Sequence, residues 1–89
     1  MIDYEAMNEP ETYVPHHMRD GFKMWFEHKI SPGSFGMAVL SNDLKEAIGR
    51  ADHINRNHIN TIVAWLYNHA PIGSWGSREA VQQWQRKAA

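Results

Sequence analysis

Apolar residues recur at helical spacing along most of this chain. The clearest stripe lies in the second half, at Ile59, Ile62, Val63, Leu66 and Tyr67. Residues three and four positions apart share one face of an α-helix, so the stripe predicts a helix there. Pro71 ends it, because proline disfavours helical geometry in the residue before it. Asp52 or Asn55 is the predicted cap at its beginning.

The same spacing predicts two helices in the first half of the chain. One starts near Pro15, a residue that suits a first helical turn, and ends before Ser31. The other starts at Ser34, a favourable N-cap, and extends to Ala51. Residues 41–43 lie inside this second helix, and their sequence Ser-Asn-Asp can bend or interrupt it.

A fourth helix is predicted after Ser77, with Val81 and Trp84 on a narrow apolar face. Its last turn contains Arg86 and Lys87, which suits the negative end of the helix dipole. No stretch shows the alternation typical of a strand. We therefore expect an all-α fold, a compact bundle of about four helices in two hairpins.

The first twelve residues differ from the rest in charge. Residues 1–12 contain four acidic residues and no basic one. They predict a short acidic N-terminal arm, followed by a single helical domain over 13–89. We expect the arm to be loosely ordered unless Ile2, Tyr4 or Met7 docks on the domain. A chain of 89 residues has the size of one domain.

A short motif occurs twice, as Gly33-Ser34-Phe35-Gly36 and Gly73-Ser74-Trp75-Gly76. Trp25 and Trp65 each stand eight residues before the first glycine, so the two copies are offset by 40 residues. The offset is consistent with a duplicated helix–turn–helix or with coincidence. Turns of this composition interrupt helices and leave N–H groups that can hold an anion.

Charge and composition exclude several classes of protein. The formal net charge is −1, whereas nucleic-acid-binding domains usually carry a basic excess. Cysteine is absent, which excludes a disulfide framework and fits a reducing cytoplasm. No apolar run approaches the roughly 20 residues of a membrane span. We expect a cytoplasmic protein that binds neither membranes nor nucleic acids.

Patterns for catalysis and metal binding are weak. No two of the six histidines have the i,i+4 spacing of a helical zinc site. The nucleophile motif Gly-x-Ser-x-Gly does not occur. We therefore expect no catalytic residue, no metal and no cofactor, and an enzyme is the least favoured reading.

Polar and aromatic residues near the turns are the candidates for binding. Asn42 and Asp43 either cap a kink or form a polar wall with Arg50. The aromatic residues of the turns are either core anchors or surfaces on which a base can stack. In the binding interpretation, Arg50 contacts a phosphate, Trp75 stacks a base, and the others supply directed hydrogen bonds. The predicted ligand-binding residues are Asn42, Asp43, Arg50, Asn68, Trp75 and Ser77.

Several segments together form a recognisable pattern. They are Ile30–Phe35, Ala38–Leu44, Glu46–Ala47, Arg50–Asp52 with Asn55, Trp65–Asn68 and Trp75–Ser77. Through them, the run from His16 to Trp84 resembles a family of small, mostly uncharacterised proteins encoded by tailed phages and prophages. The resemblance implies a bacterial cytoplasm during infection. Small accessory phage proteins often act against host defences, some by binding a defence enzyme and others by sequestering a nucleotide signal.

The leading hypothesis is a non-enzymatic phage or prophage protein that sequesters a small anionic, nucleotide-derived ligand to counter host defence. The alternative is an inhibitor that binds a host defence or host enzyme complex through its acidic arm and exposed aromatic residues. Four Trp and three Phe also predict a homodimer or larger oligomer, because a chain this short buries its aromatic residues more fully in an assembly.

Overall fold

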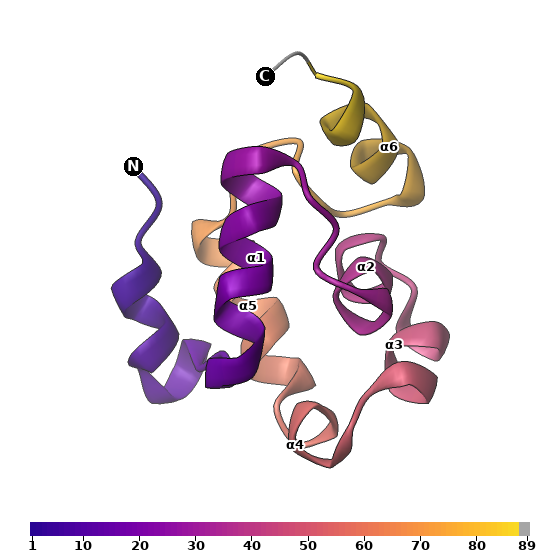
Figure 1. The fold of residues 1–89 in the computed structure, drawn as a ribbon. Helices are drawn as coiled ribbons and strands as arrows, with labels where there is room; N and C mark the ends of the chain where they lie inside the picture. Colours follow the sequence, from indigo (N-terminus) through magenta and orange to yellow (C-terminus); the bar gives the residue numbers. More distant parts are fainter. Residues whose placement is uncertain (88–89) are drawn as a thin grey trace.

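Helices are the only regular structure in residues 1–87, the part of the chain that the computed structural model describes (Figure 1). The α-helices are α1 (His16–His28), α2 (Ser34–Leu40), α3 (Leu44–Arg50), α4 (His53–Arg56), α5 (Ile59–His69) and α6 (Arg78–Arg86). Two 3-10 helices precede them, η1 (Tyr4–Asn8) and η2 (Pro10–Thr12). The expected all-α class is confirmed for these residues.

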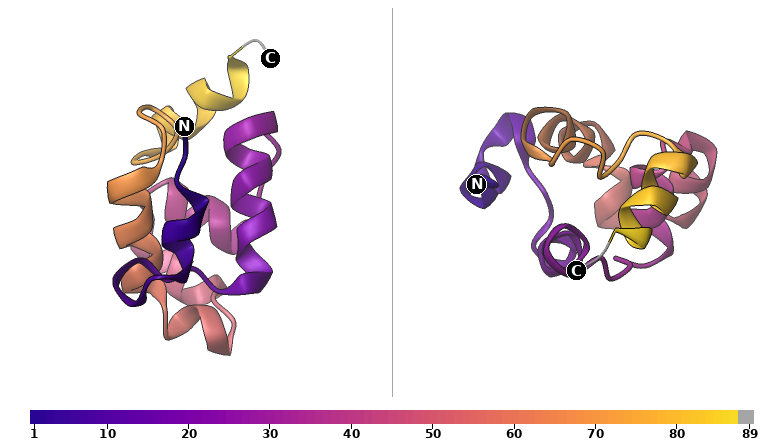
Figure 2. Two further views of the ribbon diagram at one scale, coloured as in Figure 1. Left: turned by 90° about the vertical axis from the view of Figure 1, so that its left-hand side faces the viewer. Right: turned by 90° about the horizontal axis from the view of Figure 1, so that it is seen from above.

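The longest helices, α1 and α5, run in the same direction, with α5 behind α1 in the view of Figure 1. The N-terminal segment lies alongside both of them, and α2 packs with α3 on the opposite side (Figure 2). The short helix α4 leads into α5, and α6 lies above α2, near the C-terminal end of α1 (Figure 1). The expected arrangement of about four helices in two hairpins is therefore not confirmed.

The long helix predicted over residues 34–51 is interrupted at Asn42. Asn42 has a left-handed backbone with φ of 59°. Its N–H donates to the carbonyl of Val39 at 3.0 Å, and the N–H of Asp43 donates to that of Ala38 at 2.9 Å. This is the Schellman pattern that ends many helices. The Asp43 side chain then accepts from the N–H of Glu46 and caps α3, so the predicted interruption is confirmed.

Two predicted helix caps are wrong. Ser34 is the first helical residue of α2, and the N-cap is Gly33, whose φ of 98° is open to glycine at low cost. Asp52 caps the separate helix α4, where its side chain accepts from the N–H of Asn55 at 2.7 Å. Helix α5 begins one turn later with His58 as its N-cap and no side-chain cap bond.

The buried face of α5 is rotated from the predicted stripe. Ile62, Trp65 and Leu66 are buried, whereas Val63 and Tyr67 are exposed. The rotation follows from packing around Trp65, whose ring lies 5.7 Å from that of Phe26 on α1. A large aromatic side chain buries more apolar surface than valine, so this packing turns the opposite flank of the helix outward.

The N-terminal arm is docked on the helices. Met7 is completely buried, and Ile2 and Tyr4 pack against the core. Arg19 of α1 holds the segment by donating to the carbonyls of Met7 and Val14, at 2.9 and 2.7 Å. The arm was expected to be ordered only if Ile2, Tyr4 or Met7 docks on the domain, and all three do.

Candidate functional site

A groove of about 390 Å³ lies between α2, α3 and α6. Met37, Ala38 and Val81 supply its apolar lining. Its neutral polar lining comes from Ser34, Ser41, Gln82 and Gln85. Four charged residues complete it: Asp43, Glu46, Arg50 and Arg78. The groove combines an apolar surface with several hydrogen-bonding groups, as small-molecule sites do.

The charges of this groove are balanced in pairs. Arg50 lies 3.5 Å from Glu46 on the same helix, and Arg78 lies 3.5 Å from Asp43 across the groove. Both arginine side chains are more than half exposed, and exposed pairs of this kind contribute little to stability. An anionic ligand would therefore have to compete with one carboxylate for each guanidinium.

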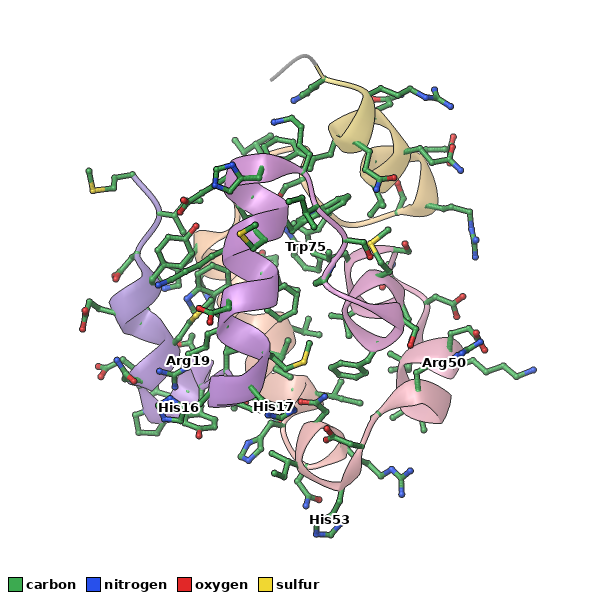
Figure 3. The ribbon with its side chains drawn as sticks, viewed as in Figure 1. His16, His17, Arg19, Arg50, His53 and Trp75 are labelled. Atoms are coloured by element: carbon green, nitrogen blue, oxygen red, sulfur yellow. The ribbon has the colours of Figure 1, made fainter. Side chains whose placement is uncertain are left out.

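The structure brings together two of the six predicted ligand residues. Asp43 and Arg50 both line the groove. Asn42 does not line the groove; it lines a smaller hollow with Val63, and Asp43 lines that hollow as well. Figure 3 shows Arg50 at the outer edge of the molecule and Trp75 toward its middle.

Trp75, Ser77 and Asn68 do not line the groove. Trp75 is partly buried against the core, and the adjacent Gly76 donates its N–H to the carbonyl of Leu40 at 2.7 Å. The Ser77 hydroxyl accepts from the N–H of Ala80 as the cap of α6. Asn68 is exposed and donates to the carbonyl of Ala64 on its own helix at 2.8 Å. The Ser77 hydroxyl and the side-chain N–H of Asn68 therefore each have a partner within the fold.

The two copies of the Gly-Ser-aromatic-Gly motif have different roles. Ser34 is exposed at the start of α2. Ser74 is buried in the loop before α6, where its hydroxyl donates to the carbonyl of Pro71 at 2.6 Å. The carbonyl of Ser74 accepts a 2.9 Å bond from the indole N–H of Trp25. The second copy thus anchors the loop to the central tryptophan.

A cationic cluster at Trp84 was not predicted. The ammonium groups of Lys29 and Lys87 both lie 4.7 Å from the centroid of the Trp84 ring. The indole N–H donates to the carbonyl of Trp25 at 3.0 Å, which fixes the ring on the end of α1. Among residues 1–87, neither lysine forms an ion pair with a carboxylate. We call Lys29, Trp84 and Lys87 the lysine–indole cluster.

The only sequence signal for this cluster is the basic ending of two helices. Lys29 follows α1 and Lys87 follows α6, and cations are favourable at these negative helix ends. That local reason explains each lysine separately. Their convergence on one indole depends on how α1 and α6 pack.

A histidine–aspartate pair connects α1 to α4. His17 Nε2 lies 3.1 Å from Asp52 Oδ2, and both side chains are exposed. The backbone N–H of Asn55 lowers the pKa of the Asp52 carboxyl, and the charge and hydrogen bond of His17 add to this effect. Figure 3 shows His53, on the same short helix, pointing outward.

Tyr4 lies under the cation of Lys23 and donates its hydroxyl to Glu27 at 2.8 Å. Burial, followed by this hydrogen bond and the charge of Glu27, raises the pKa of the phenol.

No group of three or more potential metal ligands occurs within residues 1–87.

No protein-family model matches this chain, and no curated protein or solved structure matches it significantly. Within the described residues, no helix has both the length and the apolar character needed to cross a bilayer.

Proposed function

We propose that this protein binds and sequesters a small anionic, nucleotide-derived ligand without transforming it. We place it as a phage or prophage accessory protein that acts against host defence in the bacterial cytoplasm. The observation that supports anion binding is the lysine–indole cluster, in which two ammonium groups share one indole without a carboxylate partner among residues 1–87.

The cluster has the chemistry that a phosphorylated ligand requires. Because each ammonium is 4.7 Å from the same ring centroid, the two charges are no more than twice that distance apart. A phosphate between them would relieve their mutual repulsion, and lysine commonly binds phosphate as a point charge. The indole can stack a base only where an ammonium group leaves the face of the ring to contact the phosphate. In the groove, by contrast, two carboxylates already neutralise the two arginines.

The groove at Arg50 and Asp43 is the second location for such a ligand. Its volume suits a small molecule, and both of its ion pairs are long enough to open without a large cost. The two locations make different demands on the same ligand, because only the groove requires a carboxylate to be displaced.

The alternative function, a protein-binding inhibitor of a host complex, is favoured by a different observation. Leu44, Ile48, Val63 and Tyr67 are large apolar residues that remain exposed on α3 and α5. Exposed apolar groups of this kind mark interaction surfaces.

Calorimetry with a panel of linear and cyclic nucleotides tests the proposal. We expect at least one member to bind at micromolar concentration and to be recovered chemically unchanged. The corresponding nucleoside without phosphate is the matched control, and it should bind much more weakly because it lacks the anion. If no nucleotide gives a heat at high micromolar concentration, the ligand proposal is wrong. Recovery of a hydrolysed product would instead indicate an enzyme.

A further inference from the structure

A pair of opposite charges joins two walls of the groove between α2, α3 and α6. Arg78, the first residue of α6, places its Nη2 atom 3.5 Å from Oδ2 of Asp43, the cap of α3. The Asp43 side chain is 30% exposed and that of Arg78 is 73% exposed. Both residues line the groove, so a small molecule that enters it can reach both charges.

Both members of this pair can bind a further group without separating. Oδ1 of Asp43 accepts the N–H of Glu46 at 3.2 Å, and Oδ2 accepts only the long bond from Arg78. An ionised carboxylate has about four acceptor sites, and a guanidinium has several N–H donors. Asp43 therefore retains sites for a cation, and Arg78 retains donors for an anion.

The serine hydroxyls of the groove have no partner within the described chain. Ser31, Ser74 and Ser77 lie outside the groove, and the side-chain oxygen of each forms a hydrogen bond. Ser34 and Ser41 line the groove, and neither hydroxyl forms a hydrogen bond to another group of residues 1–87. These two hydroxyls can therefore bind a ligand without breaking a bond of the fold.

An apolar surface adjoins the charged pair. Val81 lies one turn after Arg78 on α6, and residues three positions apart share a helix face. The N–H of Asp43 donates to the carbonyl of Ala38 at 2.9 Å, which brings Asp43 against the end of α2. Ala38 and Met37 supply the apolar lining on α2. A ligand whose charged end contacts the pair can therefore cover apolar surface with its other end.

We propose that this groove binds a free α-amino acid with an apolar side chain, such as leucine. An α-amino acid carries an ammonium and a carboxylate on one carbon, so the ammonium can donate to Asp43 while the carboxylate accepts from Arg78. Every charge then has an opposite neighbour. A simple anion would also meet the Asp43 carboxylate, and a simple cation would also meet the Arg78 guanidinium. The apolar side chain gains by leaving water for the apolar lining.

This inference goes beyond the nucleotide proposal and does not rest on it. An amino acid has neither a phosphate nor a base, and no residue of the lysine–indole cluster lines the groove. Leucine binding is measured without nucleotide, so each proposal can fail while the other stands.

Calorimetry of the full chain with L-leucine and two analogues tests the charge pattern. Isopentylamine is leucine without its carboxylate, and isocaproate is leucine without its ammonium. We expect leucine to bind saturably at millimolar concentration or below. Each analogue should bind roughly ten- to a hundredfold more weakly, because one charged contact is lost. Glycine should also bind more weakly than leucine, because it has no side chain to cover the apolar lining.

Asp43→Asn and Arg78→Gln each remove one charge from the groove, and asparagine can still cap α3. The matched controls are Asp20→Asn on α1 and Arg86→Gln at the other end of α6, since neither position lines the groove. We expect both groove variants to weaken leucine binding at least about tenfold, with an unchanged far-ultraviolet circular dichroism spectrum. Both controls should bind leucine as the natural chain does.

Three results would overturn the proposal. The first is the absence of saturable leucine binding to the natural chain. The second is equal binding of leucine and its two analogues, which would show that the paired charges do not select a zwitterion. The third is unchanged leucine affinity in both groove variants, which would place the amino acid elsewhere on the protein.

Discussion

Lys29 and Lys87 reach the same indole because each stands just beyond the end of a helix. Lys29 has a left-handed backbone with φ of 59°, and its N–H donates to the carbonyl of Trp25 at 3.0 Å. Lys87 follows α6 with an extended backbone. The bond to the carbonyl of Trp25 fixes the Trp84 ring that both ammonium groups contact. One residue of α1, Trp25, thus organises the cluster through its backbone.

Removing either lysine should weaken nucleotide binding. A hydrogen bond to a charged group contributes about 1.5–3 kcal/mol, so Lys29→Ala and Lys87→Ala should each lower affinity roughly ten- to a hundredfold. Added salt should weaken binding to the natural chain, because exposed charges are screened. Calorimetry at two ionic strengths measures both effects.

Lys23→Ala is the control for this experiment. Lys23 makes a similar contact with an aromatic ring, 5.0 Å above Tyr4, but lies outside the cluster. Its loss should leave affinity unchanged. If Arg50→Ala abolishes binding and the two lysine variants do not, the ligand occupies the groove and the assignment to the cluster is wrong.

At the scale of elements, Asn42 separates α2 from α3. The left-handed conformation costs an ordinary residue about 1–2 kcal/mol, whereas asparagine and glycine adopt it more readily. Asp43, in the same turn, has two roles: it caps α3 and pairs with Arg78. The polar dipeptide Asn42-Asp43 therefore serves mainly as the boundary between α2 and α3.

Substitutions at Asn42 should follow its backbone conformation. We expect Asn42→Val to lower the free energy of unfolding by about 1–2 kcal/mol, because a branched side chain opposes positive φ. Asn42→Gly should be close to neutral. Urea denaturation measures both. A tolerated valine would show that the turn can adopt another geometry.

Asp52 links two elements, as the cap of α4 and the partner of His17 on α1. Its pKa is lowered in the folded protein, so the ionised carboxylate stabilises the fold. This stabilisation is present above the unfolded value of about 3.9 and is lost as the pH falls through the lowered folded value. Acid should therefore destabilise the protein partly through this residue.

Asp52→Asn should make stability less sensitive to acid below about pH 5. Asparagine retains the ability to cap the helix, so the substitution mainly removes the titration. Thermal denaturation between neutral and acidic pH compares the two proteins. An identical loss of stability in both would show that Asp52 contributes nothing to the acid response. Asp20→Asn, at an exposed position on α1, serves as the control.

At the scale of the whole molecule, the arm is part of the core. The backbone N–H of Val14 donates to the carbonyl of Met7 at 3.1 Å, and the indole N–H of Trp65 donates to the carbonyl of Asp3 at 3.2 Å. The Tyr4 ring stacks on Trp65 at 6.1 Å. Contacts between residues some sixty positions apart therefore close the fold.

Shortening Met7 should destabilise the whole protein. We expect Met7→Ala to lower the free energy of unfolding by about 2–5 kcal/mol, since it leaves a cavity at a fully buried position. Met1→Ala, at an exposed position, should change it by less than about 0.5 kcal/mol. Urea denaturation followed by tryptophan fluorescence measures the difference. A small effect at Met7 would mean that the arm is not part of the cooperative unit.

The sequence by itself determined the helices whose signals are local. The apolar spacing and flanking prolines identified α1 and α5, and Ser77 identified the start of α6. Such signals act over one or two turns. The all-α class followed from them, as did the interruption near Asn42, although Ser34 does not cap α2, and α5 is capped by neither Asp52 nor Asn55.

Only the tertiary structure decided which surfaces and side chains meet. Tyr67 and Trp65 both fit an apolar helix, and packing against Phe26 selected the tryptophan for the core. Arg50 and Trp75, paired in the predicted site, were separated, whereas Lys29 and Lys87 converged on one ring. These outcomes depend on contacts between distant segments, and helical periodicity describes only one segment at a time.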